Sequence, residues 1–121
     1  MKFCWSTLYV KDMDESVKFY EEIIGLPVQQ RFETEDGVEI SFLGEGETKI
    51  ELIFDQSKKS INLDPDISWG FRVNSLEETM RFLVNKRINI IAGPIEPNPN
   101  IRFIYIHDPN GMKIQLVEEK D

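Results

Sequence analysis

The feature that most constrains the fold of this chain is that its two halves repeat each other. Residues 10–20 (VKDMDESVKFY) align with residues 73–83 (VNSLEETMRFL) at an offset of 63. Farther along, residues 49–52 (KIEL) align with residues 113–116 (KIQL) at an offset of 64. Segments that match in the same order at a nearly constant offset indicate two similar modules of about sixty residues each.

Each module has the sequence pattern of a strand, a helix and three shorter strands. The opening strands, 3–10 and 67–73, are rich in aromatic and β-branched residues. In the second helix Ser75 and Glu78 form a capping box, and in the first either Asp12 or Asp14 can cap. Gly25 suits the left-handed residue after the first helix. Apolar residues recur at helical spacing in both: Val17, Tyr20, Ile23 and Ile24, then Leu76, Met80, Leu83 and Val84.

The shorter strands are expected at 28–33, 38–43 and 48–54 in the first module and at 89–91, 101–106 and 112–117 in the second. A chain of 121 residues is too short for two independent domains. The sequence therefore predicts one α+β domain over residues 1–121, with modules 1–54 and 67–121 joined by a polar linker, 55–66. The two βαβββ modules are expected to form curved mixed sheets around a cup.

Alternation along the strands separates a core face from a face that lines the cup. Ile50 and Leu52 are predicted to be core residues, which leaves Glu51 and Ile53 facing the cup. The same alternation predicts that a further set of side chains faces the cup: Ser68, Gly70, Arg72, Phe103, Tyr105 and Gln115. Trp5 aligns with Ser68 in the repeat and is assigned to the same face. A mostly apolar floor with a few polar groups is typical of a small-molecule site.

Several of these residues have a structural interpretation beside the functional one. Trp5, Phe103 and Tyr105 are either ordinary core residues or a surface on which a ligand stacks. Arg72 either pairs with Glu51 or binds an anionic group of a ligand. His107, the single histidine, lies beside a turn and is expected to be exposed and structural.

The two βαβββ modules, together with three short motifs, resemble the vicinal oxygen chelate superfamily. The motifs are V-x-D-x-x-x-S-x-x-F-Y followed by Gly25-Leu26, Gly93-Pro94, and Asp108-Pro109-Asn110-Gly111 before a strand. That superfamily includes glyoxalase I, extradiol dioxygenases and bleomycin resistance proteins. The resemblance covers nearly the whole chain, and its motifs are specific for the fold rather than for one reaction.

The resemblance implies that four inward residues hold a divalent metal ion, as they do in glyoxalase I-like members. Those positions are Trp5, Glu51, Ser68 and Gln115 here, where the family expects His or Gln, then Glu, His and Glu. An indole cannot act as a ligand, and hydroxyl and amide groups are weak ligands for such metals. We therefore expect no resident metal cofactor, with weak binding of a divalent metal at Glu51 as the alternative.

Charge and composition exclude some partners. The net charge of −8 repels phosphate backbones, so nucleic acid is not expected as a partner. No apolar run approaches the roughly 18 residues that span a bilayer. Neither a secretory signal nor a cysteine pair is found, since Cys4 is alone, and both observations predict a cytoplasmic location. A homodimer is expected because symmetric dimers are the commonest soluble assemblies.

The leading functional hypothesis is a metal-independent small-molecule binding protein, similar to bleomycin-resistance-type members. Its ligand-binding residues would be Trp5, Ser68, Arg72, Phe103 and Tyr105, with an anionic ligand as one candidate. The alternative is a divergent metal-dependent enzyme of the glyoxalase I (lactoylglutathione lyase) or dioxygenase kind, anchored by Glu51. A module that binds another protein and no ligand is a third reading, which leaves Arg72 and Glu51 without a role.

Overall fold

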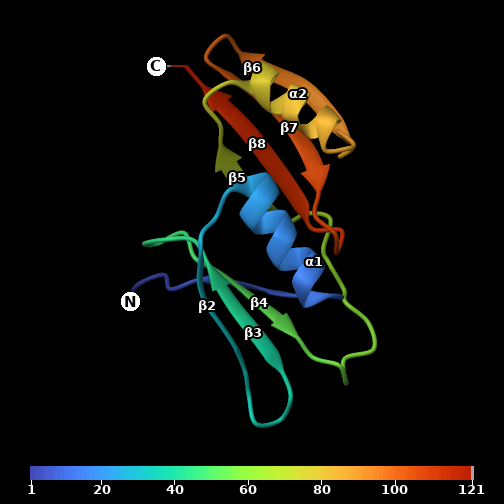
Figure 1. Ribbon diagram of the computed structural model, residues 1–121. Helices are drawn as coiled ribbons and strands as arrows, with labels where there is room; N and C mark the ends of the chain where they lie inside the picture. The colour runs from blue at the N-terminus through green and yellow to red at the C-terminus, as the bar shows by residue number, and fades with distance from the viewer. Residues whose placement is uncertain (121) are drawn as a thin grey trace. The chain divides into compact units, whose positions relative to one another are not determined.

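The structure is a computed structural model that describes residues 1–120, shown in Figure 1. The chain divides into two compact units, Met1–Asn62 and a second that begins at Leu63. Each unit contains one four-stranded mixed sheet and helical segments. The predicted α+β fold with two βαβββ modules is therefore confirmed.

In the first unit the strands are β1 (Ser6–Tyr9), β2 (Val28–Glu33), β3 (Glu39–Leu43) and β4 (Ile50–Phe54), in the sheet order β1-β4-β3-β2. In the second they are β5 (Ser68–Arg72), β6 (Ala92–Asn98), β7 (Ile101–His107) and β8 (Lys113–Glu119), in the order β5-β8-β7-β6. The first strand of each unit pairs parallel with the last, and the other pairs are antiparallel. The repeated sequence thus forms the same topology twice.

The starts of both helices and the end of the first agree with the predicted capping residues. Asp12 caps α1 (Met13–Lys18) by accepting a 2.9 Å hydrogen bond from the Glu15 N–H. The helix continues as η1 (Phe19–Ile24), a wider π-type turn, and ends at Gly25 with φ +89°. Ser75 caps α2 (Leu76–Asn85) by accepting from the Glu78 N–H.

Each unit buries an apolar core under its helical segment. The fully buried side chains include Tyr20, Leu43 and Leu52 in the first unit and Leu76, Leu83, Ile104, Ile106 and Ile114 in the second. Burying one such side chain contributes about 1.5–3 kcal/mol. The predicted apolar stripe of α2 is not buried along its full length, because 68% of Val84 is exposed. No helix among the described residues is both long and apolar enough to cross a membrane.

The predicted strand at 89–91 is also wrong, since the strand there is β6, Ala92–Asn98. β6 lies at the edge of its sheet, and its register with β7 shifts between successive pairs. An edge strand tolerates Pro94 and Pro97, which have no N–H to donate to a neighbour. Most of the proline-rich segment 94–99 is therefore part of the sheet rather than a free loop.

Candidate functional site

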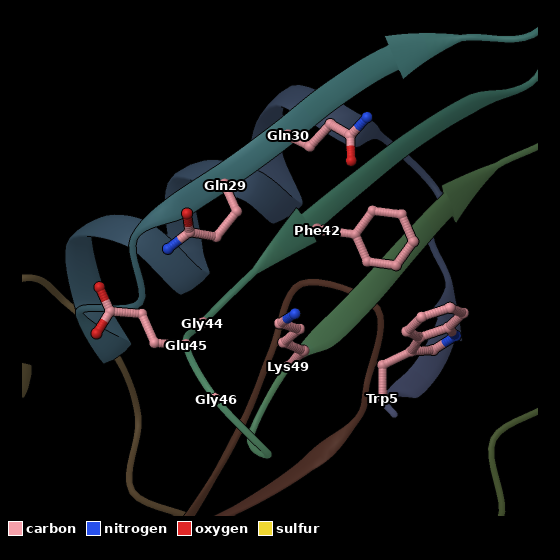
Figure 2. A pocket seen from close by; sticks show the side chains of 8 residues that line it. All are labelled: Trp5, Gln29, Gln30, Phe42, Gly44, Glu45, Gly46 and Lys49. Carbon is pink, nitrogen blue, oxygen red and sulfur yellow. The ribbon is translucent and has the colours of Figure 1, made fainter. Parts of the chain in front are cut away.

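The first unit contains a hollow of about 660 Å³, which we call the first-unit hollow (Figure 2). Its lining residues come from the chain before β1, strands β2 and β3, the loop after β3 and the residue before β4: Trp5, Gln29, Gln30, Phe42, Gly44, Glu45, Gly46 and Lys49. This volume lies within the range of small-molecule sites, roughly 300–1,000 Å³. The lining combines two aromatic rings, two amides and one charge of each sign.

The register of the sheet explains why the rings and the lysine meet here. Thr7 and Phe42 both pair with Glu51, one from each neighbouring strand. Trp5 and Lys49 come directly before β1 and β4, two residues before Thr7 and Glu51, so alternation places them on the same face as Glu51. The rings of Trp5 and Phe42 meet edge to face, with centroids 5.1 Å apart and planes at 70°.

Gly44 shapes the rim of the first-unit hollow. Its φ of +93° lies in the left-handed region, and a Cβ atom added to it would be 2.7 Å from the carbonyl oxygen of Thr48. A side chain at position 44 would therefore collide with the returning chain. The tight loop carries the backbone from β3 back to Lys49, whose carbonyl accepts a 3.1 Å hydrogen bond from the Ser6 N–H.

The polar groups of this face differ in how they are engaged. Oε1 of Glu51 accepts a 2.7 Å hydrogen bond from the Thr7 hydroxyl. Lys49 makes no ion pair, side-chain hydrogen bond or ring contact with any of the residues that the structure describes. Figure 2 shows Lys49 between Glu45 on one side and the rings of Phe42 and Trp5 on the other. The hollow thus presents a cation next to an aromatic surface.

At the other ends of β1 and β4 the first unit has a smaller hollow, of about 300 Å³. Lys58 lies over the Tyr9 ring there, 4.9 Å from its centroid. Hydrogen bonds from the hydroxyl and the backbone N–H of Ser57 hold the pKa of Asp55 below its ordinary value. Lys58 and Asp55 of this smaller hollow are therefore both engaged by neighbours, while Lys11 and Lys59 also line it.

The second unit carries the other predicted ligand residues on the corresponding face of its sheet. Phe103 and Tyr105 meet edge to face at 5.6 Å, and Lys113 lies over the Tyr105 ring at 4.3 Å. Ser68 and Arg72 are exposed on β5, where a guanidinium nitrogen of Arg72 donates to the carbonyl of Glu119 at 3.4 Å. The structure therefore places these four residues on two strands of one sheet, β5 and β7, which are separated by β8.

The predicted faces agree with the burial seen in β4, where Ile50 and Leu52 are buried and Glu51 and Ile53 are half-buried. Trp5 belongs to the first unit, whereas Ser68, Arg72, Phe103 and Tyr105 belong to the second. The Glu51–Arg72 pair joins residues of different units and stays a prediction.

Sequence reasoning missed Phe42 and Lys49. The signal for Lys49 was available, since it opens the repeated KIEL segment beside Glu51.

The single histidine and its neighbour have structural surroundings. His107 is exposed at the end of β7. Asp108 is buried, and its Oδ1 accepts hydrogen bonds from the backbone N–H groups of Asn110 and Met112 at 2.8 and 2.7 Å. The interpretation of Asp108 as a turn residue is confirmed.

The residues at the four positions that the family resemblance assigns to a metal ion do not fit one. The first unit offers an indole at Trp5 and one carboxylate at Glu51, and the second offers only the hydroxyl of Ser68 and the amide of Gln115. Trp5 is engaged with Phe42, and Glu51 with Thr7. Within residues 1–120, no three side chains of His, Cys, Asp or Glu are grouped to hold a metal ion.

Known proteins resemble this chain along nearly its full length. A family model described as the Glyoxalase/Bleomycin resistance protein/Dioxygenase superfamily matches residues 3–116. A lactoylglutathione lyase of Escherichia coli O157:H7 is 26% identical over 129 residues, covering 100% of this chain and 95% of that protein. The uncharacterized protein YraH of Bacillus subtilis is 28% identical over 127 residues, covering 96% of this chain and 97% of its own.

Solved structures give the same result for the fold. A glyoxalase family protein from Bacillus cereus has a TM-score of 0.85 at 22% identity, covering 100% of this chain and 95% of that one. The trypanothione-dependent glyoxalase I of Leishmania major has a TM-score of 0.80 at 25% identity, covering 98% and 87%. Sequence and structure thus match the same group of proteins.

Proposed function

Because the chain belongs to the Glyoxalase/Bleomycin resistance protein/Dioxygenase superfamily, we propose that it is a small-molecule binding protein that needs no metal ion. The first-unit hollow supports this proposal most directly. It has an aromatic pair, Trp5 and Phe42, beside the charged and amide groups that orient a ligand. The four expected metal-ligand positions supply one carboxylate, which favours binding of an intact ligand over metal-dependent turnover.

In this proposal the ligand stacks on Trp5, which keeps 44% of its surface exposed despite its contact with Phe42. A large aromatic ring offers contact area with little loss of side-chain freedom. We further propose that Ser68, Arg72, Phe103 and Tyr105 are ligand-binding residues on the sheet face of the second unit. The function would resemble that of bleomycin-resistance-type members, which sequester a ligand and leave it unchanged.

Calorimetry with bleomycin and with a panel of planar aromatic acids tests this proposal, each measured with and without EDTA. A ligand of the hollow should bind equally well in EDTA, and Trp5→Ala should weaken it about tenfold or more. Phe82→Ala is the matched control, because Phe82 is an exposed aromatic residue on α2. Binding that disappears in EDTA, or that Trp5→Ala leaves unchanged, would refute the proposal.

A second candidate function is a divergent lactoylglutathione lyase anchored by Glu51. Relatives named lactoylglutathione lyase in Escherichia coli and Haemophilus influenzae favour it, as does Glu51 itself, which lies on the same sheet face as Trp5 and Lys49. The test is formation of S-lactoylglutathione from methylglyoxal and glutathione after loading with nickel or zinc. Activity that Glu51→Gln abolishes would favour the lyase, and no activity above a blank would count against it.

We also propose that the chain works as a homodimer in the cytoplasm. Symmetric dimers are the commonest soluble assemblies. Light scattering at micromolar concentration is expected to give twice the mass of one chain, 14.2 kDa. A mass equal to that of one chain would refute the dimer.

A further inference from the structure

The two copies of the repeated strand place a lysine at the same register but give it different surroundings. In the first unit Lys49 comes two residues before Glu51, which pairs with Thr7, and in the second Lys113 comes two residues before Gln115, which pairs with Gly70. The ring that pairs with the residue two positions later is Phe42 in the first unit and Tyr105 in the second. Lysine and ring are therefore equivalent in the two units.

The ring of Tyr105 is covered by its lysine, whereas the ring of Phe42 is not. Nζ of Lys113 lies 4.3 Å from the Tyr105 centroid, a geometry in which the ring face attracts the cation. In the first unit the indole of Trp5 takes the place beside Phe42, at 5.1 Å. The residue equivalent to Trp5 in the second unit is Ser68, which has no ring. Among the described residues Lys49 has no ring contact, whereas Lys113 has one with Tyr105.

The charge of Lys49 is consequently available in the first-unit hollow. It has no ion pair or side-chain hydrogen bond with the residues described. Glu45 lines the same hollow, and a carboxylate there disfavours a second negative charge on a ligand. The hollow therefore offers an aromatic surface for stacking and one cation, and its carboxylate disfavours a ligand with more than one negative charge.

We propose that Lys49 selects the ligand of this hollow by its charge, and that this ligand is a planar aromatic monoanion. The inference rests on the proposed binding function and names its ligand class. In this view Lys49, rather than Arg72, is the group that pairs with the anion. Lys113, held on Tyr105, does not recognise an anion.

Two fluorescent probes with the same ring system separate charge from stacking. The anion is 8-anilino-1-naphthalenesulfonate, and its uncharged counterpart is N-phenyl-1-naphthylamine. Lys49→Met should raise the dissociation constant of the sulfonate about fivefold, which is the effect of one partly exposed ion pair. The uncharged probe should change by less than about twofold. Lys49→Arg keeps the charge and should keep sulfonate binding.

Further variants distinguish failure of the inference from failure of the proposed function. Trp5→Ala and Phe42→Ala should weaken both probes if the hollow is the site. If they weaken neither, both proposals are overturned. If they weaken both while Lys49→Met affects the two probes equally, the charge inference alone is overturned. A larger loss of sulfonate binding in Lys113→Met than in Lys49→Met would also overturn it. Circular dichroism of each variant verifies that the full chain is folded.

Discussion

The hydroxyl of Thr7 donates a 2.7 Å hydrogen bond to Oε1 of Glu51, across the parallel pair β1 and β4. The equivalent pair in the second unit is Gly70 and Gln115. A Cβ atom on Gly70 would lie 3.2 Å from Oε1 of Gln115, closer than an ordinary contact. The repeated strands therefore differ in the partner of the inward residue as well as in its charge.

The chemistry of these inward residues predicts low metal content. After incubation with nickel, zinc, manganese or cobalt and thorough dialysis, elemental analysis should give well below about one metal ion per chain. One carboxylate, already bonded to Thr7, is too small a donor set for tight binding. Glu51→Ala should leave this background unchanged. About one metal ion per chain, lost in Glu51→Ala, would instead support the lyase.

The rim of the first-unit hollow should be sensitive to a single methyl group. Gly44→Ala places a Cβ atom 2.7 Å from the Thr48 carbonyl, at a φ of +93°. Gly25→Ala is the matched control, because its φ is +89° and no atom lies within 4 Å of its added Cβ. We expect urea unfolding to show a loss of about 1 kcal/mol for Gly25→Ala and roughly 2–3 kcal/mol for Gly44→Ala. Equal losses of stability in the two variants would show that the loop after β3 moves to make room for the added methyl group.

The internal repeat predicted the order of strands and helices in both units. Periodicity and capping residues then placed most of these elements, because both are local signals in the sequence. Asp12, Ser75 and Gly25 all act as expected. The exception is β6, whose prolines indicate a loop to any argument based on strand propensity. Edge strands lack one neighbour, so tertiary pairing with β7 decides their bounds.

The site was harder to predict, because polarity misassigns one of its strands. In β3 the polar Ser41 is fully buried, with its hydroxyl 3.3 Å from the sulfur of Met13, while the apolar Phe42 is half-buried beside Trp5. A rule that places apolar residues in the core exchanges these two. The position of Lys49 depends on the same register, so sequence reasoning found Trp5 and Glu51 without the residues around them.

The start of α2 should make stability depend on pH through Glu118. Its Oε2 accepts a 2.7 Å hydrogen bond from the Leu76 N–H, and its Oε1 accepts from Arg102 at 3.1 Å. The Leu76 bond first, and then Arg102, lower the pKa of Glu118 in the folded chain. A lowered pKa contributes stability that is present above the unfolded pKa and is lost as pH falls through the folded value.

Glu118→Gln should therefore lower the melting temperature at neutral pH, and the difference from the unsubstituted chain should shrink below about pH 4. Glu119→Gln, at the exposed neighbouring position, is the control and should change neither quantity. Thermal melts followed by circular dichroism across the acidic range provide the measurement. A deficit that stays constant from neutral to acidic pH would contradict the role of the carboxylate charge.

The contact of Trp5 with Phe42 should appear as an energetic coupling. Edge-to-face aromatic pairs contribute roughly 0.5–1.5 kcal/mol beyond their buried area. Urea unfolding of Trp5→Ala, Phe42→Ala and the double variant should give a coupling energy in that range. Phe32→Ala combined with Trp5→Ala is the control and should show no coupling. Phe32 lies on β2 opposite Ile40, and no ring contact with Trp5 is found among the described residues. Losses for Trp5 and Phe42 that simply add would mean that the rings do not support each other, and the stacking surface would then have to form on ligand binding.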